Sequence, residues 1–192
     1  MSYLKENEYI VVPSESYRIL HNCSGCGKKT SFVNTNNFRV NANGNKVDVW
    51  LIYQCEECKH TCNLPIYERV KPSMIPKEEY EKFLSNDEML ALEYGNDKAF
   101  FARNKAVIDT TKIRYSVLKV GREPFNEQGS ITIQNPYGIK ARVDKVLAEI
   151  LHEKRNVITK QLREGTLSCN QTFVGCEGTT VRRIRLQSEQ VV

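Results

Sequence analysis

Cys23-Ser24-Gly25-Cys26 and Cys55-Glu56-Glu57-Cys58 are two Cys-x-x-Cys pairs, and the residues between them have the pattern of a β-hairpin. A tight turn with this spacing can offer two thiolates to the same metal ion. Two such turns supply the four soft ligands of a tetrahedral site. We therefore predict that Cys23, Cys26, Cys55 and Cys58 bind one structural Zn2+ ion. A site closed by four thiolates stabilises a fold and leaves no open position for catalysis.

The stretch between the two pairs carries the signals of paired strands. Asn43-Gly44 is a turn signal, because both residue types tolerate positive φ. Apolar residues alternate with other residues from Val47 to Tyr53, and the incoming strand shows the matching alternation from Phe38 to Ala42. Two Cys-x-x-Cys turns around such a hairpin are typical of a zinc ribbon, which we expect within residues 1–70.

Redox chemistry is the main alternative for the four thiols. A redox Cys-x-x-Cys pair should begin a helix, whose dipole lowers the thiol pKa. The residues after Cys26 are instead polar and strand-like, which favours the metal. His21, His60 and Cys62 flank the pairs, and we expect them at the surface or around the ligands, because four cysteines already complete the coordination number.

The composition is that of a soluble globular protein: the chain has 192 residues, of which 40% are hydrophobic and 27% charged. Its length allows one domain or two to three small modules. The first residues include acids and lack an apolar run, and no later run reaches the length of a membrane span, so we expect a cytosolic protein. Seven cysteines in a reducing compartment favour metal binding over disulfides. We interpret Cys169 and Cys176 as ordinary small residues.

Residues 71–138 are predicted to be a connecting region of helices and strands. Helices are expected from Pro76 to Leu84, from a capping box at Ser85–Glu88 to Gly95, and over Lys98–Lys105. Strands are expected over Lys112–Val120 and Ser130–Gln134, separated by a turn-rich stretch with Gly121, Pro124, Asn126 and Gly129. The region has no phosphate-binding loop, no His-Glu-x-x-His and no Gly-x-Ser-x-Gly motif, which argues against an enzyme.

The next segment has the pattern of two helices in succession. Residues 142–151 predict a strongly amphipathic helix, because apolar residues recur at helical spacing, namely Val143, Val146, Leu147, Ile150 and Leu151. A second helix is expected over Arg155–Glu164, with Gly165 as its stop and a short strand over Thr166–Asn170. Arg155, Thr159 and Arg163 share one face of this helix, with Lys160 adjacent, and offer donors suited to phosphate oxygens.

This helix pair resembles the S4 RNA-binding fold. The resemblance is carried by Arg142-x-Asp144-Lys145-x-Leu147-Ala148 and, further on, by Arg155, Leu162, Gly165, Leu167 and Asn170. It implies an S4-like αα-β module over residues 139–192 that docks on structured RNA through Arg142, Lys145, Arg155, Lys160 and Arg163. A helical hairpin with a solvated basic face is the alternative interpretation.

The chain as a whole also resembles an uncharacterised bacterial family, domain of unknown function 1062. The resemblance is carried by Phe38-Arg39-Val40-Asn41-Ala42, Asp48–Cys55 and Asn63–Val70. It covers most of the chain and implies no established activity.

These observations predict an α+β chain with a zinc ribbon at residues 1–70, the connecting region at 71–138 and the S4-like module at 139–192. The last segment holds most of the positive excess, with ten lysine and arginine residues against six acidic residues in a chain of net charge +5. Our leading hypothesis is a non-catalytic, zinc-containing protein that binds structured RNA, such as ribosomal or transfer RNA, or the ribosome. A zinc-ribbon module that binds a protein partner is the alternative, and an RNA-modifying enzyme with a site in residues 71–138 is a third possibility.

Overall fold

The computed structural model describes residues 7–120, 130–169, 171–176 and 179–183. They fall into two compact units. The ribbon unit comprises residues 15–114, and the helix-pair unit combines residues 7–14 with the described residues from 115 onward. The predicted turn-rich stretch with Gly121, Pro124, Asn126 and Gly129 lies outside the described residues, as does Asn170.

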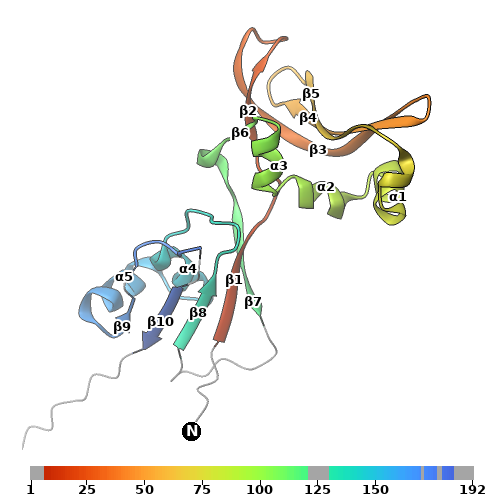
Figure 1. The fold of residues 1–192 in the computed structure, drawn as a ribbon. Helices are drawn as coiled ribbons and strands as arrows, with labels where there is room; N and C mark the ends of the chain where they lie inside the picture. The colour runs from red at the N-terminus through yellow and green to blue at the C-terminus, as the bar shows by residue number, and fades with distance from the viewer. Residues whose placement is uncertain (1–6, 121–129, 170, 177–178, 184–192) are drawn as a thin grey trace, which may run out of the picture. The chain divides into compact units, whose positions relative to one another are not determined.

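A five-stranded antiparallel sheet, in the order β5-β4-β3-β2-β6, forms the framework of the ribbon unit (Figure 1). Its strands are β2 (Ile19–Cys23), β3 (Lys28–Asn43), β4 (Lys46–Cys55), β5 (Thr61–Val70) and β6 (Val107–Ile108). The predicted hairpin is confirmed, since β3 and β4 pair down to Asn43 and Lys46. Gly44 is the first of the two residues that connect these strands. Its φ of 63° is expected for glycine at this position of a two-residue hairpin turn.

Three short helices follow β5: α1 (Lys77–Ser85), α2 (Glu88–Tyr94) and α3 (Lys98–Arg103), with 3-10 turns η1 (Pro72–Met74) and η2 (Thr110–Lys112). Helix α2 begins after Asp87, whose carboxylate accepts a hydrogen bond from the Leu90 N–H at 2.8 Å. The predicted capping box at Ser85 is wrong, because Ser85 still belongs to α1, which ends in the left-handed residue Asn86.

The three helices share one hydrophobic core with the sheet. Phe83, Phe100 and Phe101 are buried together with Leu51 and Tyr53 of β4. Apolar burial of this kind is the main favourable contribution to folding. Residues 71–114 therefore complete the ribbon unit, whereas the sequence pattern placed them in a connecting region. Short helices do not reveal from their own pattern which sheet they cover.

Side-chain amides tie a bulge in β3 to the helices. The Asn34 Nδ2 donates to the carbonyl oxygen of Ala91 at 2.9 Å, and the Phe38 N–H donates to the Asn86 Oδ1 at 2.7 Å. The register of β3 with β4 shifts between Asn34 and Phe38. The bulge thus turns backbone and side-chain groups toward the helices instead of toward β4.

The helix-pair unit has a mixed sheet in the order β7-β1-β8-β10-β9. Its strands are β1 (Asn7–Pro13), β7 (Tyr115–Val120), β8 (Ser130–Gln134), β9 (Leu167–Ser168) and β10 (Thr179–Arg183). Only the β1–β8 pair is parallel. Strand β1 comes from the N-terminal segment, which was predicted to be part of the zinc ribbon but belongs to the helix-pair unit.

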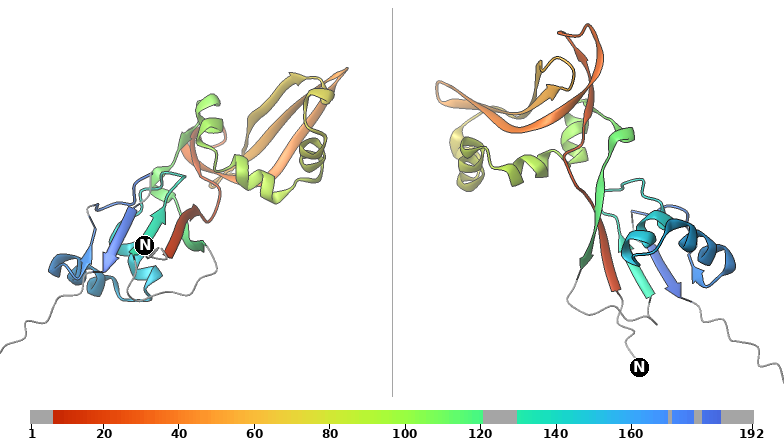
Figure 2. Two further views of the ribbon diagram at one scale, coloured as in Figure 1. Left: turned by 60° about the horizontal axis from the view of Figure 1, so that its bottom comes forward. Right: turned by 180° about the vertical axis from the view of Figure 1, so that it is seen from behind.

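Two helices, α4 (Val143–Ile150) and α5 (Arg155–Glu164), pack on one face of this sheet (Figure 2). Both lie where the sequence predicts them, and Gly165 ends α5 in the left-handed conformation. The buried residues of α4 include Val143, Val146 and Leu147, which confirms the predicted apolar stripe. Among the described residues, every helix is too short or too polar to span a membrane.

Candidate metal centre and basic helix pair

Each Cys-x-x-Cys pair forms the turn of a hairpin, the first between β2 and β3 and the second between β4 and β5. The two turns have the same backbone design. The Gly27 N–H donates to the Cys23 carbonyl at 2.9 Å, and the Lys59 N–H donates to the Cys55 carbonyl at 3.1 Å. Gly27 and Lys59 adopt φ values of 66° and 67°. Neither pair begins a helix, so the context expected of a redox pair is missing from both turns.

The two turns bring the four predicted ligands together. The Sγ atoms of Cys23, Cys26, Cys55 and Cys58 all lie within 4.8 Å of one another. Cys23 and Cys58 approach to 3.3 Å, and Cys26 and Cys55 to 3.9 Å. Over the part of the chain that the structure describes, this is the one group of three or more potential metal ligands at such spacing. The arrangement is compatible with a metal site.

Gly25 lies against this cluster. A Cβ atom at this position would lie 2.9 Å from the Cys58 Sγ and 3.8 Å from the Cys23 Sγ. A contact of 2.9 Å is closer than real Cβ atoms come, so a side chain here would displace a sulfur atom. Glycine at this position thus lets the first turn lie against the sulfur atoms in their present places.

Hydrogen bonds stabilise a thiolate at Cys55. Burial opposes its ionisation, but the backbone N–H groups of Cys58 and Glu57 and the Thr30 hydroxyl lower the pKa of Cys55 to about 6. The Thr30 Oγ1 lies 3.2 Å from the Cys55 Sγ. Contact with the Cys58 thiol instead raises the pKa of Cys26. Thiolates are the species that bind metal ions, so the protein itself favours one of the four in its binding form.

The residues that flank the cysteine pairs lie outside the cluster, as expected. The His60 Nε2 is 2.9 Å from the Ser24 Oγ, which links the two turns. The His21 ring packs edge-on against Phe32 at 5.5 Å between ring centroids. Cys62 is partly buried on β5, and burial raises the pKa of its thiol.

A carboxylate at the start of α4 joins two of the predicted RNA contacts. Arg142 precedes α4 and donates its Nε–H to the Asp144 Oδ1 at 2.9 Å, and Arg155, the first residue of α5, donates its Nε–H to the Oδ2 at 2.7 Å. The Asp144 side chain is 9% exposed, whereas those of Arg142 and Arg155 are 50% and 52% exposed. Desolvation opposes ionisation of Asp144, but the two guanidinium groups outweigh it and lower its pKa.

Two lysines of the helix-pair unit lie over aromatic rings. The Lys145 Nζ is 4.8 Å from the centroid of Tyr115, and the Lys140 Nζ is 5.3 Å from the centroid of Phe173. Phe173 forms an isolated β-bridge with Arg142 and is 39% exposed. Such cation–π contacts restrict the lysines while leaving their charges in solvent.

The remaining predicted RNA contacts lie toward the end of α5. Lys160 forms a surface ion pair with Glu164 at 3.7 Å, and Arg163 is exposed. Lys160 follows Arg155 by five residues, which puts it about 140° around the helix, and Arg163 follows by eight residues, which puts it about 80° around the helix and two turns further on. The structure thus joins Arg142 to Arg155 through Asp144, whereas Lys160 pairs with Glu164.

Sequence reasoning missed three residues of this region as functional candidates: Lys140, Asp144 and Phe173. Asp144 lies in the stretch that carries the resemblance to the S4 fold, but an acidic residue is not expected to contact RNA phosphates. Lys140 and Phe173 meet through the bridge between Arg142 and Phe173, which no spacing in the sequence reveals.

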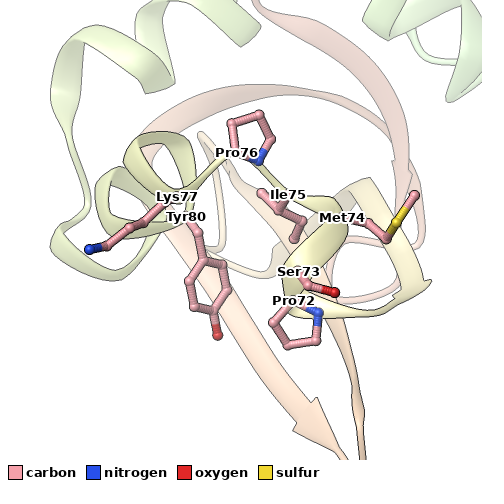
Figure 3. A pocket seen from close by; sticks show the side chains of 7 residues that line it. All are labelled: Pro72, Ser73, Met74, Ile75, Pro76, Lys77 and Tyr80. Atoms are coloured by element: carbon pink, nitrogen blue, oxygen red, sulfur yellow. The ribbon is translucent and has the colours of Figure 1, made fainter.

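A shallow hollow of about 570 Å3 lies elsewhere, on the ribbon unit (Figure 3). Residues of η1 and the start of α1 line it, namely Pro72, Ser73, Met74, Ile75, Pro76, Lys77 and Tyr80. Lys77 and Tyr80 are the ionisable side chains among these lining residues, which include no carboxylate, histidine or cysteine.

The fold and the cysteine cluster define a small α+β protein with a candidate tetrathiolate metal centre. The chain belongs to the family described as Protein of unknown function (DUF1062), whose model matches residues 40–172. The resemblance noted from the sequence is thereby confirmed. The matched segment contains Cys55, Cys58 and the helix pair, and begins after Cys23 and Cys26. No curated protein and no solved structure matches the chain.

Proposed function

We propose that this protein binds structured RNA through its helix pair and that a zinc ion stabilises its ribbon unit. The observation that carries the proposal is the joined pair of exposed guanidinium groups at the starts of α4 and α5. Guanidinium groups match phosphate oxygens in geometry and charge. Lys140 and Lys145 add positive charge to the same unit, and the exposed Phe173 ring offers a surface for base stacking.

Structured RNA suits a rigid basic surface of this kind. An A-form helix hides its base edges in a deep, narrow groove, so proteins contact its backbone and 2′-hydroxyl groups. Each phosphate that is neutralised releases counterions, so affinity should fall steeply with salt. Ribosomal or transfer RNA is the expected target, and a cytosolic location, where thiols stay reduced, is part of the proposal.

Zinc fits the cysteine cluster. Zn–S bonds are about 2.3 Å long, which places the sulfur atoms of a tetrahedral site about 3.8 Å apart. The separations of 3.3 Å and 3.9 Å fall on either side of this value, and all four sulfur atoms lie within 4.8 Å of one another, so small side-chain shifts would bring them to tetrahedral positions. Cys23, Cys26, Cys55 and Cys58 would hold the ion, which would crosslink the two hairpin turns. With four protein ligands, its contribution is to stability and not to catalysis.

RNA binding is testable by fluorescence anisotropy with a labelled RNA hairpin whose stem has about 16 base pairs, titrated at several salt concentrations. The Arg142→Gln/Arg155→Gln variant should bind more weakly, with a salt slope reduced by about two. Lys71→Gln/Lys105→Gln is the matched control, because it removes two exposed charges from the ribbon unit. Equal affinities for all three proteins, or no binding by the wild type, would refute the proposal.

Sedimentation of the tagged protein through a sucrose gradient of its own cell lysate would identify the size of the target. Salt-sensitive migration with ribosomal particles would support a ribosomal RNA target. Binding to the hairpin without such migration would direct attention to transfer RNA or other small RNAs.

Exposed apolar side chains favour a second candidate function, the binding of a protein partner. Met74, Leu84 and Met89 of the ribbon unit are 75%, 58% and 72% exposed, and Met74 lines the hollow. Methionine-rich surfaces adapt to protein partners. A partner that the Met74→Ser/Met89→Ser variant loses and the Arg142→Gln/Arg155→Gln variant retains would support this function.

A further inference from the structure

Asp144 is a buried acid in a surface otherwise rich in basic groups. Its carboxylate is the shared acceptor of two arginines that begin different helices. An acid at this place reduces the positive charge with which a surface attracts RNA, because it cancels one of the two positive charges beside it. Its presence therefore calls for a compensating role.

We propose that Arg142 and Arg155 form one phosphate-binding clamp and that Asp144 is the residue that positions them. This inference rests on the proposed RNA binding and adds to it the residue that gives the surface its shape. The ligand it specifies is a backbone phosphate that accepts hydrogen bonds from both helix starts at once.

The contacts of the clamp leave donors for a ligand. A guanidinium group has five N–H donors in a planar fork. Asp144 engages the Nε–H of each arginine and, at a longer 3.4 Å, the Nη2 of Arg142. The other Nη groups make no hydrogen bond to any described residue, and about half of each side chain is exposed. Two arginines and one carboxylate leave a net charge of +1 for an anion.

Anchoring by Asp144 also reduces the entropic cost of binding. A free arginine side chain loses much rotamer freedom when it grips a ligand. Here the carboxylate already holds both side chains in the folded protein, so a smaller part of that freedom remains to be lost. Arg163 on α5 differs from Arg142 and Arg155 in this respect, because it is exposed and has no ion pair to any described residue.

Other charged side chains of α4 and of the segment before it are held by partners of their own. Lys145 lies one turn beyond Arg142 on α4 and is held over Tyr115 of β7. Lys140 is held over Phe173, whose backbone bridges that of Arg142. Glu149 of α4 accepts a hydrogen bond from the Val117 N–H at 3.4 Å. Asp144 is thus the one acid among the described residues in contact with either arginine.

Charge and positioning make opposite predictions for the Asp144→Asn variant. Removing a negative charge from a basic surface should tighten RNA binding if the acid acts only through its charge. Loss of the anchor should instead weaken binding to the RNA hairpin, by about fivefold to tenfold. Glu153→Gln is the matched control: it removes one exposed negative charge between α4 and α5, and binding should tighten by less than about twofold.

A second variant separates positioning from folding. Arg142→Lys/Arg155→Lys keeps both charges but lacks the planar fork that Asp144 holds, so it should lose affinity about as much as Asp144→Asn. In the Arg142→Gln/Arg155→Gln background, adding Asp144→Asn should change RNA affinity no further. A thermal melt of each variant confirms that the comparison is between folded proteins.

The outcomes distinguish the clamp from the proposed function. If the wild type binds the hairpin and Asp144→Asn binds equally well or more tightly, the clamp is refuted and RNA binding stands. The same holds if the double lysine variant binds like the wild type. If the wild type does not bind the hairpin, RNA binding itself fails, and the clamp fails with it.

Discussion

Replacing Gly25 by alanine should damage the candidate metal centre while leaving the rest of the hairpin intact. The new Cβ would lie 2.9 Å from the Cys58 Sγ, where ordinary contacts begin at about 3.4 Å. The sulfur atom, the backbone turn or both must therefore move by about half an ångström. Metal–ligand distances tolerate only about 0.2 Å, so the tetrahedral geometry should be lost or strained.

The cost of such overpacking is about 1–3 kcal/mol. It should appear as a loss of zinc affinity of about fivefold to a hundredfold, because about 1.4 kcal/mol corresponds to a factor of ten. Competition with a chromogenic chelator measures this affinity, and circular dichroism during chemical denaturation measures the accompanying loss of stability.

Glu57→Ala is the matched control, since Glu57 occupies the same position in the second turn and its side chain forms an exposed ion pair with Lys28. Loss of an exposed pair costs less than about 1 kcal/mol. Wild-type zinc affinity in Gly25→Ala would refute the steric argument and the cluster geometry on which it depends.

Three further outcomes follow from the structure. Cys55→Ser should lose the one zinc ion per chain that native mass spectrometry should detect in the wild type, and it should destabilise the ribbon unit. Asp87→Ala should lower the free energy of unfolding by about 1 kcal/mol in a denaturant titration, because it removes the hydrogen bond to the Leu90 N–H. The pKa of Asp144 is lowered in the folded protein, so the unfolded chain binds more protons in acid. Its stabilising contribution should be complete above the ordinary pKa of an aspartate, about 3.9, and be lost as the pH falls through the lower folded value. Unfolding measured between neutral and acidic pH should therefore show a steeper loss of stability for the wild type than for Asp144→Asn.

Local sequence signals located the main parts of the candidate sites. The cysteine spacing predicted the four residues that meet in the cluster, and the apolar periodicity predicted α4 and α5 nearly to the residue. These features depend on neighbours within a turn or a hairpin, which a sequence pattern can express. The Asn43-Gly44 signal likewise marked the turn that closes β3 on β4.

These local signals could not predict which strands pair when they are far apart in the sequence. Strand β1 pairs with β7 and β8, more than a hundred residues later, and no local pattern distinguishes those partners from the ribbon strands. The role of Asp144 was also hidden, because it depends on Arg142 and Arg155 meeting across two helices. In both cases the information lies in contacts between segments far apart in the chain.

The place of β1 has a consequence for how the chain can be divided and synthesised. Residues 15–114 form an uninterrupted segment, inserted between β1 and the other strands of the sheet to which β1 belongs. A fragment that begins at residue 139 would lack three of the five strands of that sheet, and removal of the first fourteen residues would take out a strand that lies between two others. During translation β1 leaves the ribosome before residues 15–114, yet it has no sheet to join until the ribbon unit and the strands after it have followed. A strand made before the whole ribbon unit therefore reaches its final hydrogen bonds only after that unit has been made.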